Sequence, residues 1–98
     1  MGRGINSHDP HNEQMRNERL AESIEVIVHF ATNGIRPLRF LWKGNSHKVN
    51  SVRGRWITLE GRKKCRHYAI TTNSVGNCEI SFDTETMHWK IDSVAIPD

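Results

Sequence analysis

The basic side chains in the middle of this sequence are the residues whose type and spacing most directly suggest chemistry. Residues 34–67 hold ten Lys or Arg and one acid, whereas residues 1–33 have a net charge of −2 and residues 68–98 a net charge of −4. A local excess of positive charge attracts polyanions, phosphates among them, in a salt-dependent way. The candidate nucleic-acid-binding residues are Arg39, Lys43, Arg53, Arg55, Arg62, Lys63, Lys64 and Arg66.

Two other interpretations of the basic residues stay open. The positive charges could pair internally with the acidic ends of the chain, or they could serve only to keep a small domain in solution. In either case the basic face would have no partner of its own. The sequence does not separate these interpretations from nucleic-acid binding.

Other patterns that could support catalysis or metal binding are weak. His8 and His11 lie in a polar segment, without the supporting contacts that orient metal ligands. Cys65 and His67 fall two residues apart on one expected strand face, but that segment holds no acid to complete a nucleophilic set. Asp83 lies where an Asp commonly begins a turn. The sequence therefore predicts a protein that is not an enzyme, with no catalytic residue, metal site or cofactor.

The two cysteines, Cys65 and Cys78, are expected to be free thiols. They would lie at opposite ends of a hairpin that turns at NSVGN, too far apart for the geometry of a disulfide. Neither has a second cysteine two to four residues away, as common zinc sites require.

Alternation of apolar and polar residues predicts a series of β-strands. A period of two is the mark of a strand with one buried face. The third expected strand breaks strict alternation, which predicts a bulge or strong bend near Asn50 to Gly54. The expected strands cover about residues 23–30, 39–44, 47–59, 66–72, 78–83 and 87–94.

Short strands separated by turn signals favour an all-β fold. We expect an antiparallel meander of five or six strands, curled into an SH3-like or Tudor-like barrel. Residues 22–98 would form this domain, and residues 1–21 a flexible N-terminal arm that is disordered or weakly helical. No apolar run is long enough for a membrane span, and no signal-like apolar segment begins the sequence, so the expected location is cytoplasmic.

The aromatic residues decide whether the basic surface also offers stacking platforms. Leu38, Phe40 and Trp42 alternate along one strand and are expected in the core, as is Trp89. The predicted bend leaves open which face Trp56 takes. Exposed aromatics beside Lys and Arg are typical of small barrels that bind single strands.

One set of motifs extends over most of the chain: IEV, RPLRFLWKGNSHKV, RW, RHYAITT and FDTETMHWKIDSV. These motifs resemble a family of short bacterial proteins of unknown function with the pattern P-x-x-F-x-W-x-G … W … Y … W. The likeness covers about residues 24–95, and its motifs are mainly structural. Its matched positions are Pro37, Phe40, Trp42, Gly44, Val49, Trp56, Tyr68 and Trp89.

The resemblance implies a fold more than an activity. Where that family usually has an aromatic residue after the W-x-G turn, this sequence has His47, which removes one candidate stacking residue. Genes of the family sometimes accompany those of Y-family translesion polymerases, so the resemblance implies a loose link to DNA repair. The leading hypothesis is a non-catalytic module that binds nucleic-acid phosphates; the alternative is a protein-interaction adaptor that docks an acidic or extended peptide along a barrel edge.

Overall fold

The computed structural model describes the backbone of residues 15–97 and the side chains of residues 17–96. All regular structure in this range is β-strand, as the alternating sequence predicts. No helix among these residues is long and apolar enough to cross a membrane. The strands are β2 (Met15–Ala31), β3 (Gly34–Trp42), β4 (Asn45–Lys48), β5 (Ser51–Glu60), β6 (Lys63–Thr72), β7 (Gly76–Asp83) and β8 (His88–Pro97).

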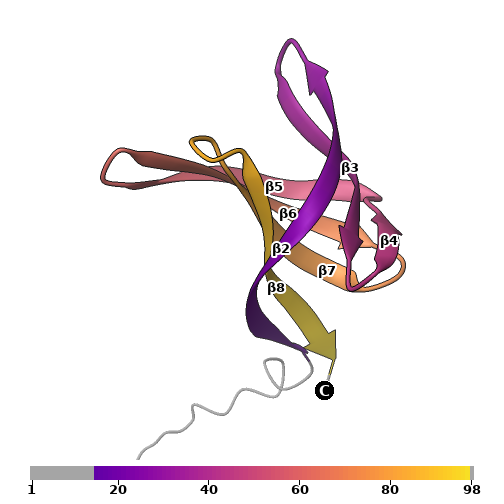
Figure 1. The fold of residues 1–98 in the computed structure, drawn as a ribbon. Helices are drawn as coiled ribbons and strands as arrows, with labels where there is room; N and C mark the ends of the chain where they lie inside the picture. Colours follow the sequence, from indigo (N-terminus) through magenta and orange to yellow (C-terminus); the bar gives the residue numbers. More distant parts are fainter. Residues whose placement is uncertain (1–14, 98) are drawn as a thin grey trace, which may run out of the picture.

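The seven strands form one antiparallel sheet in the order β4-β3-β2-β8-β7-β6-β5 (Figure 1). Strand β2 changes partner along its length: Ile24 lies opposite Trp89 of β8, whereas Val26 lies opposite Phe40 of β3. Because its second half leaves β8, the β2–β3 hairpin and the β5–β6 hairpin project in different directions.

The beginning of β2 falls in the segment that the sequence assigns to a flexible arm. Residues 15–21 belong to this strand, and several of them pair with β8. The remainder of the expected arm, residues 1–14, lies outside the described residues.

The expectation of a closed barrel with five or six strands is wrong, because the sheet has seven strands and does not close. Its edge strands β4 and β5 meet at a corner, where the Val49 N–H donates to the Leu38 carbonyl (2.9 Å) and the Asn50 N–H donates to the Thr71 carbonyl (2.8 Å). No ladder joins β4 to β5 among the described strands. With four residues, β4 offers few backbone groups for a second ladder.

The predicted bend in the third strand is present. The register of β5 against β6 shifts between Val52 and Gly54, which makes Arg53 an extra residue on β5. A β-bulge of this kind increases the local twist of a strand. It therefore helps to curl the sheet next to the β4–β5 corner.

The core lies on the inner face of the curled sheet. Ile80 of β7 is in cross-strand register with Tyr68 of β6 and Ile91 of β8, and both isoleucines are fully buried. Phe40 packs into the same cluster from β3. Burial of each such side chain contributes roughly 1.5–3 kcal/mol to stability. Trp42 and Trp89, both expected in the core, are partly buried against it.

Leu38, by contrast, is 39% exposed, although the alternation predicts it in the core. Its neighbours Pro37 and Arg39 pair with consecutive residues of β2, so Leu38 is the extra residue of a β-bulge. A bulge shifts the alternation of a strand by one position. Pro37 is therefore buried in place of Leu38.

The turn between β3 and β4 generates a test of the fold. Lys43 and Gly44 form this two-residue turn with φ angles of 53° and 78°, as a type I′ hairpin requires. Gly44→Ala places a Cβ in the left-handed region, although nothing lies within 4 Å of it. We expect the free energy of unfolding to fall by about 1–2 kcal/mol in urea denaturation.

The control for this variant is Gly54→Ala. A Cβ added at Gly54 would also have nothing within 4 Å of it, but the φ of Gly54 lies outside the left-handed region. This substitution should leave stability unchanged or slightly raised. Equal losses in the two variants would contradict the type I′ turn.

Candidate nucleic-acid interface

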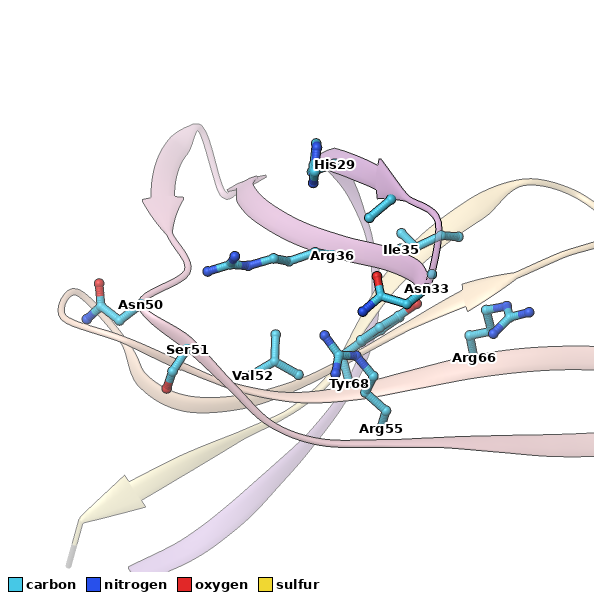
Figure 2. Close-up of a pocket in the computed structure, with 12 residues that line it drawn as sticks. His29, Asn33, Ile35, Arg36, Asn50, Ser51, Val52, Arg55, Arg66 and Tyr68 are labelled. Atoms are coloured by element: carbon cyan, nitrogen blue, oxygen red, sulfur yellow. The ribbon is translucent and has the colours of Figure 1, made fainter.

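A hollow of about 500 Å³ lies between the β2–β3 hairpin and strands β5 and β6 (Figure 2). One wall is the end of the β2–β3 hairpin, from His29 to Arg36. The other wall holds residues from Asn50 to Arg55, with Tyr68 of β6. These segments are distant in sequence, and the β4–β5 corner brings them together.

Three arginines from three different strands line this hollow: Arg36, Arg55 and Arg66. They define what we call the arginine hollow. In Figure 2, Arg36 extends from β3 into the space above β5, and the Arg55 side chain lies beside Tyr68. The lining contains no Asp or Glu, and no described carboxylate forms an ion pair with the three guanidinium groups. Uncompensated charges of one sign in a concave space raise the local positive potential.

Tyr68 contributes a polar group to the arginine hollow. Its side chain is 3% exposed, and its ring packs against Trp89 with the centroids 5.6 Å apart. Burial raises the pKa of the hydroxyl above its ordinary value of 10.0, and the nearby charges of Arg66 and Arg55 oppose this rise. Tyr68 is one of the residues that line this hollow. The buried ring therefore leaves a hydrogen-bonding group available to a ligand.

Two smaller hollows adjoin the arginine hollow. One, of about 240 Å³, is lined by Arg39 and Lys48 and shares Asn50 with it. The other, of about 280 Å³, shares Arg55, Arg66 and Tyr68 with it and adds Trp56, Ile57 and His67. We call the three adjoining hollows together the basic groove; its Lys and Arg residues are Arg36, Arg39, Lys48, Arg55 and Arg66.

Three of the eight candidate residues named from the sequence therefore line the basic groove: Arg39, Arg55 and Arg66. Arg39 also donates a hydrogen bond from its Nη1 to the Ser46 hydroxyl (2.9 Å), which orients its side chain. Arg55 lies directly opposite Tyr68 in the β5–β6 ladder. The ladder thus fixes the spacing of the groups that face the hollow.

Four other candidates lie outside the lining of the basic groove. Lys43 occupies the β3–β4 turn, with its Nζ 4.8 Å from the centroid of the Trp42 ring. Arg53 is the exposed bulge residue of β5. Arg62 and Lys64 lie at the far end of the projecting β5–β6 hairpin.

Lys63, the eighth candidate, is engaged elsewhere. Its Nζ lies 3.1 Å from Asp83 Oδ2. The hydrogen bond and the charge of Asp83 raise the pKa of Lys63 above its ordinary value of 10.5. Lys63 therefore joins the start of β6 to the end of β7, while its side chain stays 42% exposed.

Sequence reasoning missed Arg36 and Lys48 as site residues. The turn signals predict a turn that extends to Pro37 and includes Arg36, whereas the structure limits the turn to residues 32–33 and puts Arg36 in β3. Asn33-Gly34 is a signal of a tight hairpin turn, and it could have shown that the strand resumes before Arg36. For Lys48 the sequence gives no indication of a binding role beyond its place among the ten Lys and Arg of residues 34–67.

The opposite face of β5 and β6 carries a polar cluster. The Trp56 ring stacks on His67, with the centroids 5.3 Å apart and the planes at 7°. Both residues also line the 280 Å³ hollow of the basic groove. Thr58 Oγ1 lies 2.8 Å from His67 Nε2, and Asp92 Oδ2 lies 3.9 Å from His67 Nδ1. His67 thus bonds to Thr58 rather than to Cys65. In the described part of the chain, no three His, Cys, Asp or Glu residues are grouped to hold a metal ion.

Comparisons with protein-family models, with curated proteins and with solved structures found no match to this chain.

Asp83 generates a prediction about stability at low pH. Its Oδ1 accepts hydrogen bonds from the N–H groups of Glu85 (2.9 Å) and Thr86 (3.3 Å). Burial raises the pKa of Asp83, but these bonds and the Lys63 ion pair outweigh it and lower the pKa from 3.8 to about 2. A carboxylate with a lowered pKa contributes stability that is lost as the pH falls from its unfolded-state value toward its folded-state value.

We expect Asp83→Asn to have a lower urea midpoint than the parent protein at about pH 6. The difference between the two urea midpoints should narrow as the pH falls from 3.8 to about 2, because Asp83 of the parent protein then loses its negative charge. Glu85→Gln, an exposed change in the same turn, controls for the loss of one negative charge. A gap that stays constant down to about pH 2 would show that the Asp83 charge is not responsible.

Proposed function

We propose that this protein is a non-catalytic binding module whose basic groove contacts the phosphates of DNA or RNA. The observation that carries the proposal is the convergence of Arg36, Arg55 and Arg66 on one hollow with no carboxylate in its lining. A role as a cytoplasmic accessory to DNA repair is part of the proposal. That part rests on the motifs that resemble proteins encoded near Y-family polymerases.

Guanidinium groups suit phosphate better than most side chains. Each presents several N–H donors in a planar fork that matches two phosphate oxygens. Arg36 comes from the β3 wall of the hollow, whereas Arg55 and Arg66 come from the paired strands β5 and β6. This arrangement favours a bound anion over general solubility as the role of these charges.

A second candidate, docking of an acidic extended peptide, is favoured by the position of β5. This ten-residue strand is an edge of the sheet, so one side of its backbone is not paired with any described strand. A peptide could add to such an edge, with Arg53 and Arg55 as partners for its acidic side chains.

Binding can be tested by fluorescence anisotropy of labelled DNA and RNA across a salt series. We expect micromolar affinity at low salt that weakens steeply as salt is added, because phosphate contacts release counterions. Arg55→Glu should weaken binding about tenfold. It should also reduce the slope of log K against log salt concentration by about one, the amount expected for one lost phosphate contact.

The matched control is Lys90→Glu. Lys90 is also exposed and its substitution changes the net charge equally, but it lies beside His67 and Asp92 on the opposite face. This variant should bind like the parent protein. Absence of binding at low salt, or equal losses in the two variants, would refute the basic groove as the nucleic-acid surface.

A further inference from the structure

The shape of the basic groove indicates which form of nucleic acid it would bind; this inference rests on the proposed function. Its central part lies between the β2–β3 hairpin on one side and β5 on the other. From Ser51 to Ile57 the path along β5 covers six residue steps, or about 20 Å at the usual rise of a strand. The groove is therefore long enough for several linked units of a polymer.

The side chains along the groove alternate between two chemistries. On the face that lines the groove, the ladder sets Arg55 opposite Tyr68 and Ile57 opposite Arg66. Farther along the same face, Leu59 lies opposite Lys64. Ile57 is 48% and Leu59 69% exposed, so cationic and apolar groups lie side by side in solvent.

The Tyr68 hydroxyl adds a third kind of contact. Tyr68 as a residue is 3% exposed and lines the arginine hollow. Arg36 and Arg55 flank the same hollow. A phosphate held there would accept hydrogen bonds from the hydroxyl and from both guanidinium groups.

We infer that the basic groove is built for single-stranded nucleic acid, with one phosphate seated among Arg36, Arg55 and Tyr68 and a neighbouring base laid on Ile57. A duplex keeps its bases paired and stacked inside, so it could bring only its phosphates to the rim of the groove. A single strand exposes both its phosphates and the apolar faces of its bases. The alternation of charge and apolar surface along β5 matches the single strand.

The test compares a labelled single strand of about 15 nucleotides with a duplex of the same sequence, using the full chain. We expect the single strand to bind at least about tenfold more tightly at equal salt. Tyr68→Phe, which removes only the hydroxyl, and Ile57→Ser should each weaken single-strand binding about fivefold and leave duplex binding unchanged.

Leu41→Ser is the matched control for Ile57→Ser. Leu41 is 43% exposed, close to the exposure of Ile57, but it lies on β3 and lines none of the three hollows of the groove. It should leave binding of both nucleic acids unchanged. An equal loss in the Leu41 variant would overturn the role of Ile57 as a base platform.

The outcomes separate this inference from the proposed function. Duplex binding as tight as single-strand binding would overturn the inference and leave the proposed function intact. No binding of either nucleic acid at low salt would overturn both. Competition by a polyglutamate peptide as strong as by the unlabelled single strand would also overturn both, and would favour the peptide-docking candidate. If a nucleoside monophosphate displaced the labelled single strand at the same concentration as the unlabelled strand does, the groove would be a site for one free nucleotide. That result would overturn the inference that it binds a nucleic-acid strand.

Discussion

The pairing of β2 with two different strands is the constraint on which the rest of the structure depends. The first half of β2 completes a ladder with β8, and the second half leaves that ladder to pair with β3. Two nearly independent sheets would otherwise form, β2–β3–β4 and β5–β6–β7–β8. Their shared strand holds them at an angle, and this angle separates the two projecting hairpins that border the basic groove.

The corner at Val49 and Asn50 brings the two edges of the sheet close enough to enclose the hollow. Two hydrogen bonds tie these residues to the backbones of β3 and β6, so the chain passes from one edge of the sheet to the other within two residues. Because the edges meet there without forming a ladder, the sheet is curled but open. An open sheet leaves Arg36 and Arg55 lining an open hollow, whereas a small closed barrel fills its interior with core side chains.

The all-β class could be predicted because period-two alternation is a local property of the sequence. Phe40 and Ile80 are buried as their patterns indicate. The exposure of Leu38 could not be predicted, since the bulge that reverses its side depends on how β3 pairs with β2. The site was partly predictable for the same reason. The concentration of Lys and Arg in residues 34–67 identified Arg55 and Arg66 as candidates. That they line one hollow with Arg36 depends on contacts between segments far apart in sequence. The composition of a surface can be estimated from sequence, whereas the grouping of its charges is a property of the tertiary fold.

The split role of β2 also has a consequence for the order of folding. Of the six ladders between described strands, five join neighbours in sequence and can form through short turns; the sixth joins β2 to β8, with Ile24 opposite Trp89. Closing such a long loop carries a large entropic penalty before its contacts are made. On topological grounds we therefore expect the β2–β8 ladder to form last, and until it forms the unpaired edges of β2 and β8 are open to other chains.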